Sequence, residues 1–199
     1  MPKVVRRQTP PPFSRYQDYK PFLRLDFLHR CSYCGVREAS WGGQTHFHVD
    51  HFKPKSMFPE LETMYFNLYY SCDRCNTYKR AFWPTATELT HGQRFYDACI
   101  DRSKHHFRME TDGSLSAISP CGTYSLQRLR LNRATLTQLR NQRLEFIVQY
   151  RMILRNERFL RLRFTESTSE DRDALALAIR TIAIQRRKYR NLVKLSPMD

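Results

Sequence analysis

Residues 31–35 read CSYCG, residues 48–56 read HVDHFKPKS and residues 67–76 read NLYYSCDRCN. The first and third stretches each contain a CxxC pair, formed by Cys31 with Cys34 and by Cys72 with Cys75. Four thiolates make a closed tetrahedral Zn²⁺ site, in which no ligand position is left for water. The spacing therefore predicts a structural zinc site that ties the two ends of this segment together.

The residues between the two cysteine pairs carry the groups that phosphodiester hydrolysis requires. Asp50 and His51 are neighbours in this interval, and Asn76 directly follows Cys75. Histidine takes a proton from water near neutral pH without a large change in its pKa. Carboxylate and amide oxygens are the ligands that hard divalent cations prefer. We therefore expect His51 to be a general base, and Asp50 and Asn76 to bind one cation that offsets charge on the phosphate.

The expected strand around Asp50 and His51 sets a geometric condition on this site. Residues 45–52, THFHVDHF, are rich in aromatic and β-branched side chains, which favours a strand. Neighbouring side chains of a strand point to opposite faces, so a bulge or the end of the strand must direct both toward one cleft. Pro54 follows closely and cannot donate to a strand ladder, so we expect the strand to end there.

The segments around the motifs predict a small module of helices and strands. Residues 17–30 have amphipathic helical spacing and lead directly into the first CxxC pair. Residues 65–71, YFNLYYS, predict a second strand, and residues 72–81 predict a helix that ends before Pro84. Residues 36–44 and 56–63 are expected to be loops. The order strand, strand, helix follows from these assignments.

The rest of the chain divides into an arm and an extension. Residues 1–14 are basic and Pro-rich and predict an extended arm, whereas residues 15–84 form the zinc-stapled module. Residues 85–199 begin as a mixed region, with a hairpin at 104–118 centred on Asp112-Gly113. The pattern then becomes helical from Leu126, with a last helix over about 168–194. The predicted fold class is α+β with a mainly helical C-terminal extension.

The charge of the chain limits its partners. The 199 residues contain 34 Lys and Arg against 19 Asp and Glu, a formal net charge of +15. Such a field attracts polyanions, so nucleic acid is the expected partner, ahead of an anionic membrane surface or an acidic protein. A basic protein without a polyanionic partner is the alternative. The Arg-rich helix of 128–163 fits a phosphate-binding face or a face that packs on an acidic partner, which the sequence does not rank, or else ordinary surface.

Composition also sets expectations for location and for the remaining cysteines. No apolar run approaches the roughly 20 residues that span a bilayer, and the first residues lack the apolar core of a signal peptide. We expect a soluble cytoplasmic protein, where paired thiols indicate metal rather than disulfides. Cys99 and Cys121 are expected to be buried or half-exposed free thiols. A second zinc site is the alternative, although it lacks a CxxC pair. No role is assigned to His105 or His106.

The motifs CSYC, HVDHFKPKS and NLYYSCDRCN together resemble the HNH nuclease family in its zinc-containing form. The resemblance covers about residues 20–80 and implies a ββα-metal fold that holds one catalytic cation. It implies that His51 is the general base, that Asp50 is a metal ligand and that Asn67 braces the loop and orients the base. Asn76 occupies the last motif position, which is commonly His in the family. An Asn there keeps an oxygen ligand and favours Mg²⁺ or Mn²⁺ over a softer ion.

A narrower resemblance concerns the region after the motif. Residues 122–143 are similar to the corresponding region of small HNH proteins from bacterial anti-phage systems of the Septu and retron-linked types. Those proteins work with an ATPase partner, so the resemblance implies a defence nuclease that has such a partner.

Four cations flank the expected cleft and are assigned to phosphate contact, with a solvated rim as the alternative: Lys53, Lys55, Lys79 and Arg80. DNA is favoured over RNA as the substrate. A zinc-ribbon module that binds nucleic acid without catalysis is the rival hypothesis, and it leaves Asp50, His51 and Asn76 unexplained. A third hypothesis is an adaptor whose basic helices dock on an acidic ATPase, with the nuclease site active only in that complex.

Overall fold

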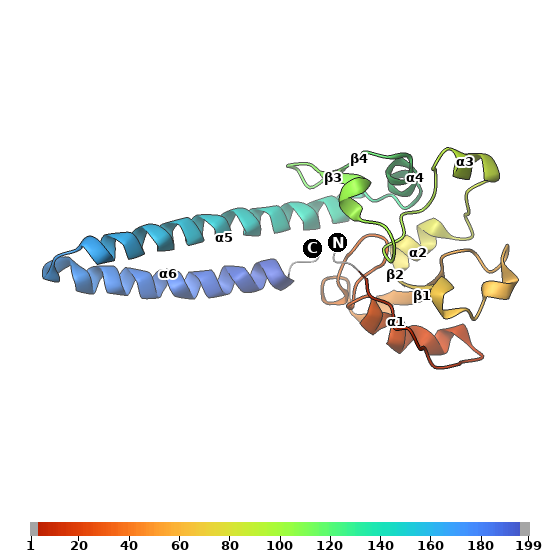
Figure 1. The fold of residues 1–199 in the computed structure, drawn as a ribbon, viewed down its shortest axis with the longest axis horizontal. Helices are drawn as coiled ribbons and strands as arrows, with labels where there is room; N and C mark the ends of the chain where they lie inside the picture. Colours follow the sequence, from red (N-terminus) through yellow and green to blue (C-terminus); the bar gives the residue numbers. More distant parts are fainter. Residues whose placement is uncertain (1–3, 196–199) are drawn as a thin grey trace.

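The computed structural model describes residues 4–195 and consists of a compact module and a long helical hairpin (Figure 1). The helices are α1 (Lys20–Asp26), α2 (Asp73–Lys79), α3 (Ala86–Thr90), α4 (Pro120–Arg128), α5 (Ala134–Glu166) and α6 (Ser169–Leu195). The strands are β1 (Phe47–His51), β2 (Leu68–Cys72), β3 (Phe107–Met109) and β4 (Leu115–Ala117). The predicted α+β class and the helical C-terminal extension are confirmed.

Strands β1 and β2 form an antiparallel pair whose register runs from Phe47 opposite Cys72 to His51 opposite Leu68. Helix α2 starts at Asp73, immediately after β2, so the predicted order of strand, strand and helix is confirmed. The second strand is shorter than predicted, because Tyr65–Asn67 form a 3-10 turn before it. All five residues of β2 are buried, which makes it the centre of the module.

Helix α1 ends earlier than the predicted helix of 17–30. Its last residue is Asp26, and Leu28 and His29 adopt positive φ values of 54° and 58°. A right-handed helix cannot continue through that conformation. The chain turns back instead, and the amide of Ser32 donates to the carbonyl of Tyr70 at 2.8 Å. This turn brings the first CxxC pair beside β2.

The described part of the N-terminal arm, residues 4–14, contains neither helix nor strand and packs on the module. Val4 and Arg6 are buried, and Arg6 donates to the carbonyl of Tyr65 at 2.6 Å. Arg7 binds the carboxylate of Asp26 through its backbone and side chain at 3.0 and 2.9 Å. Arg6 and Arg7 therefore stabilise the fold, because they are held by carbonyl and carboxylate oxygens of the module.

A small region built from β3, β4 and α4 connects the module to the hairpin. The predicted hairpin around Gly113 is confirmed, since β3 and β4 pair antiparallel. The helical region begins at Pro120 rather than Leu126, and Arg130 adopts a φ of 47° where α4 has ended. Helix α5 then starts at Ala134.

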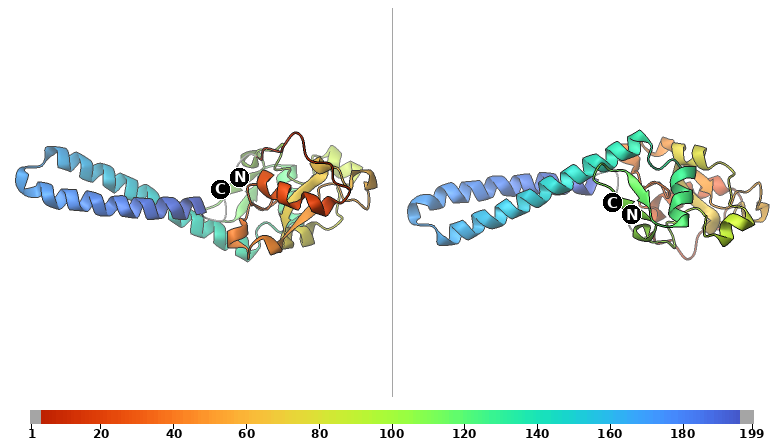
Figure 2. Two further views of the ribbon diagram at one scale, coloured as in Figure 1. Left: turned by 90° about the horizontal axis from the view of Figure 1, so that it is seen from below. Right: turned by 90° about the horizontal axis from the view of Figure 1, so that it is seen from above.

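Helices α5 and α6 run antiparallel and project away from the module in every view (Figures 1 and 2). Glu157 is buried between them and pairs with Arg161 at 2.9 Å and with Arg186 of α6 at 3.1 Å. Large apolar side chains such as Phe159 stay exposed on this hairpin. Within residues 4–195, none of the helices combines the length and the hydropathy that crossing a membrane requires.

Candidate active site

The four cysteines of the two CxxC pairs meet at one buried point. Their sulfur atoms all lie within 4.8 Å of one another, and the sulfurs of Cys34 and Cys72 are 3.9 Å apart. The edge of a ZnS₄ tetrahedron is about 3.8 Å, because Zn–S bonds are near 2.3 Å. Four thiolates packed this closely repel one another, so a cation is required to hold them together. The residues fit a zinc-sized ion.

Arg133, at the N-cap of α5, lies against this sulfur cluster. Its Nη2 atom is 3.6 Å from Cys75, 3.8 Å from Cys34 and 4.0 Å from Cys72. The guanidinium also lies over the ring of Trp41 at 5.6 Å. A divalent ion with four thiolates carries a net charge of −2, so this cation is placed to offset it. No local pattern predicts this contact, since Arg133 is one of many arginines in the region.

Asp50 lies in β1 with its carboxylate directed toward α2 and the first CxxC loop. The hydroxyl of Tyr33 donates to Oδ2 at 2.5 Å, and the Lys79 ammonium lies 3.2 Å from the same oxygen. Burial raises the pKa of Asp50, and the charge of Lys79 opposes that rise. Neither Tyr33 nor Lys79 was assigned to Asp50 from the sequence.

Lys79 does not lie on the rim, where the sequence placed it for phosphate contact. Its side chain is fully buried and donates to the carbonyl of His51 at 2.6 Å. Burial lowers the pKa of Lys79, and Asp50 opposes that change. The face of α2 that carries Lys79 packs against β1, so this ammonium cannot reach a phosphate in the present arrangement. The prediction of a nucleic-acid contact for Lys79 is therefore corrected.

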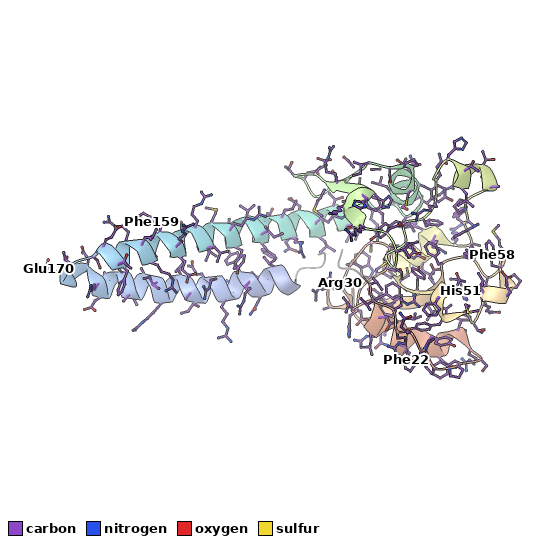
Figure 3. The ribbon with its side chains drawn as sticks, viewed as in Figure 1. Phe22, Arg30, His51, Phe58, Phe159 and Glu170 are labelled. Atoms are coloured by element: carbon purple, nitrogen blue, oxygen red, sulfur yellow. The ribbon has the colours of Figure 1, made fainter. Side chains whose placement is uncertain are left out.

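His51 is the last residue of β1 and lies in the module, at the opposite end of the molecule from Glu170 (Figure 3). Its Nε2 atom is 2.9 Å from the carbonyl oxygen of Glu62, and the ring of Tyr16 packs edge-on at 4.6 Å. A carbonyl oxygen only accepts, so Nε2 carries the proton and Nδ1 of the neutral ring keeps its lone pair. Burial lowers the pKa of His51, which favours that neutral form at pH 7.

Asn67 joins the start of β2 to the loop that follows β1. Its Oδ1 accepts from the amide of Lys53 at 2.9 Å, and its Nδ2 donates to the carbonyls of Lys53 and Leu61 at 3.0 and 3.3 Å. The backbone carbonyl of Asn67 also accepts from Phe52 at 2.8 Å. This one side chain therefore holds both ends of the loop whose Glu62 carbonyl binds His51.

Asn76 lies on α2, one helical turn before Lys79, and is half-buried. Residues three apart share a helix face, so Asn76 lies on the same side of α2 as the lysine that contacts Asp50. The structure thus brings Asp50 to α2, whereas the ring of His51 faces Tyr16 and the loop. Asp50 and His51 still lie close enough for each charge to affect the pKa of the other.

The three other predicted phosphate contacts are exposed. Lys55 pairs with Glu62 at 2.7 Å, and Lys53 lies 5.4 Å from the centre of the Phe58 ring. Arg80 follows α2 and points to solvent. These cations lie on the loop beside His51 and at the end of α2, so they surround the candidate site.

The zinc-stapled module is similar to a known protein family. Residues 31–82 match the family model described as HNH endonuclease. The matched segment contains both CxxC pairs, β1, β2 and α2, so the resemblance to HNH nucleases seen in the motifs is confirmed.

One curated relative extends the match beyond the module. The protein named Septu protein PtuB, from Bacillus thuringiensis, is 30% identical over 96 residues. The alignment covers 45% of this chain and 34% of that protein. The chain therefore spans about a third of the length of the relative that it matches.

Proposed function

We propose that the protein is a metal-dependent endonuclease that hydrolyses phosphodiester bonds of nucleic acid, with DNA as the favoured substrate. The observation that best supports this proposal is the environment of the His51 side chain. The imidazole is buried, its pKa is lowered, and Nε2 is occupied by the carbonyl of Glu62 at 2.9 Å. A general base needs this combination, because the ring must be neutral and its free nitrogen must point away from its anchor.

In the proposed mechanism, Nδ1 of His51 accepts a proton from the water that attacks phosphorus. The carbonyl of Glu62 then stabilises the imidazolium, since the Nε2 proton already donates to it. Tyr16 fixes the plane of the ring, and Asn67 keeps the loop with Glu62 in place. These contacts position the base before the substrate arrives.

Two kinds of metal ion belong to the proposal. Zn²⁺ bound by the four cysteines has a structural role, because its ligand set leaves no position for water. Mg²⁺ or Mn²⁺ is assigned to Asp50 and Asn76, whose carboxylate and amide oxygens would hold it. When bound, this ion supplies positive charge that offsets the charge developing on the phosphate.

The proposed substrate contacts are the exposed cations Lys53, Lys55 and Arg80, and the net charge of +15 supports a polyanionic partner. The similarity to a Septu protein supports a role in anti-phage defence. We therefore propose that the chain acts in the cytoplasm together with an ATPase partner. The basic hairpin with exposed apolar side chains is the surface that we assign to such a partner.

The direct test is cleavage of plasmid, linear DNA and RNA at low salt, with Mg²⁺, Mn²⁺ or EDTA. We expect metal-dependent cutting by the parent and none by His51→Ala. The matched control is His48→Ala, which alters an exposed histidine on the same strand and should keep the parental rate. Equal cutting by the His51→Ala variant would contradict the assignment of the base.

If the parent protein cuts none of these substrates, a second experiment is needed rather than further substrates. Native co-purification, followed by the same assay on the complex, separates a nuclease that requires its partner from a zinc-ribbon module that only binds. Metal-dependent cutting by the complex, lost with His51→Ala, supports the nuclease. Binding without cutting in the complex supports the rival hypothesis.

A further inference from the structure

A second group of metal-binding side chains lies outside the HNH module, in the region of β3, β4 and α4. Asp101 and His106 lie in the loop before β3 and Cys121 lies in the first turn of α4, and their ligand atoms all lie within 4.8 Å of one another. Cys121 is buried, and the side chains of His106 and Asp101 are only 15% and 10% exposed. The three groups offer one thiolate, one imidazole and one carboxylate, which is a mixed donor set typical of zinc.

The distance between two of the donors is right for a shared ion and wrong for a hydrogen bond. Nε2 of His106 is 3.6 Å from Oδ1 of Asp101. The N–O edge of a zinc tetrahedron is about 3.4 Å, because both bonds to the metal are close to 2.1 Å. A hydrogen bond between these atoms would be nearer 2.9 Å. The two side chains therefore face each other at the separation that a metal ion between them requires.

The other nitrogen of His106 is already bound in the way that metal-ligating histidines require. Nδ1 lies 2.7 Å from Oγ of Ser119, and the same oxygen accepts the amide of Gly122 at 3.0 Å. With Nδ1–H donating to Ser119, the lone pair of the neutral ring is on Nε2. The side chain that caps α4 thus also fixes the histidine tautomer.

Backbone packing brings the thiol of Cys121 to the same place. Gly122 lies so close to His106 that a Cβ atom there would be 2.1 Å from the His106 carbonyl oxygen. Only glycine permits this approach, and it holds the first turn of α4 against the His106 backbone. Cys121 is carried to the cluster by that contact.

Arg94 and the backbone amide of Asp97 also bind Asp101. The guanidinium of Arg94 donates to Oδ2 at 2.6 Å and to Oδ1 at 2.8 Å, and Asp97 donates to Oδ2 at 2.9 Å. A carboxylate oxygen has two lone pairs, and metal-bound carboxylates are commonly held by such hydrogen bonds. Arg94 therefore orients Asp101 and leaves Oδ1 able to bind one further cation.

We propose that Asp101, His106 and Cys121 form a second zinc site, which joins the loop before β3 to α4 and keeps one position for water. This region has two strands of three residues each and a short helix, so a metal ion would stabilise it where apolar burial is small. The proposal is independent of nuclease activity. The rival explanation is a metal-free network in which a charged His106 faces Asp101.

Native mass spectrometry of the full chain, saturated with Zn²⁺ and passed over a weak chelating resin, counts the ions. We expect two zinc ions on the parent, one on Cys121→Ser, and two on the control Cys99→Ser, whose thiol lies outside the cluster. One ion on the folded parent would overturn the proposal, and so would two on Cys121→Ser.

A Co²⁺ titration of the parent tests the site without any substitution. The second equivalent should add sulfur-to-cobalt absorption at about a quarter of the intensity of the first, because one thiolate binds instead of four. No further sulfur band after the first equivalent would contradict the second site. This measurement keeps the test decisive if Cys121→Ser does not fold.

Discussion

The ammonium nitrogen of Lys79 lies 3.2 Å from Oδ2 of Asp50, and both side chains are buried where α2 packs on β1. A buried carboxylate without a partner is costly, so this lysine allows Asp50 to be charged inside the module. Lys79 also donates to the carbonyl of His51, and thus it joins β1 to the helix that carries Asn76.

Replacing Lys79 by Met should lower the free energy of unfolding by about 3 kcal/mol, because it leaves the Asp50 carboxylate unpaired. Urea denaturation measures this change. Arg80→Met is the matched control and should stay within about 0.5 kcal/mol, since Arg80 is exposed. Adding Asp50→Asn to Lys79→Met should restore part of the loss, and strictly additive effects in the double variant would contradict the pairing.

The parts of the site that are close in sequence were predictable, and the parts made by packing were not. The CxxC spacing predicts the sulfur cluster because each pair lies within one turn, and Asn67 was found through its motif position. Lys79 was misplaced because α2 has only seven residues. Two turns give too little periodicity to show whether Lys79 or Arg80 faces β1.

Contacts between distant segments explain the other omissions. Arg133 is 99 residues from Cys34, and no local pattern separates it from the neighbouring arginines. The second cluster has the same origin, since Asp101, His106 and Cys121 have no regular spacing and meet only because Gly122 packs on His106. Spacing reveals metal ligands that share a turn, whereas ligands from separate segments require the fold.

Arg133→Ala should speed the loss of zinc from the four-cysteine site by roughly tenfold, because groups beside metal ligands commonly affect affinity by 10- to 100-fold. Release into a chromogenic chelator gives the rate. Arg130→Ala is the control, since Arg130 lies over the ring of Tyr78 at 4.9 Å without contacting sulfur. Equal release rates for the parent and Arg133→Ala would show that this cation does not stabilise the thiolates.

Asn67→Ala should slow cleavage by about 100-fold, because it frees the loop that holds the Glu62 carbonyl on His51. The loss of its hydrogen bonds to buried backbone should also lower stability by roughly 2 kcal/mol. Both effects are measured on the same protein samples, the first as the rate of nucleic-acid cleavage and the second by thermal unfolding. Ser56→Ala changes an exposed residue of the same loop and should alter neither, whereas a parental rate for Asn67→Ala would exclude the bracing role.

The contact between Asp26 and the N-terminal arm should make stability depend on acid pH. Burial acts to raise the pKa of Asp26, but hydrogen bonds from Tyr65 and Arg7 outweigh it and lower the pKa below 3.8. A carboxyl whose folded-state pKa is depressed contributes stability above its unfolded pKa, and that stability is lost as the pH falls through the folded value. The stabilisation should therefore be complete at pH 7 and decline only below about pH 4.

Asp26→Asn should accordingly lower the free energy of unfolding at pH 7 by roughly 2 kcal/mol. The difference between parent and variant should shrink as the pH falls below about 4, because the parent then loses the same charge. Parallel urea titrations of both proteins at several pH values measure this difference. Any zinc lost at acid pH affects parent and variant alike, so it does not change the difference between them. Asp18→Asn, at an exposed position, should leave stability at pH 7 nearly the same. A gap between parent and Asp26→Asn that widens toward acid pH would show that the carboxylate does not anchor the arm.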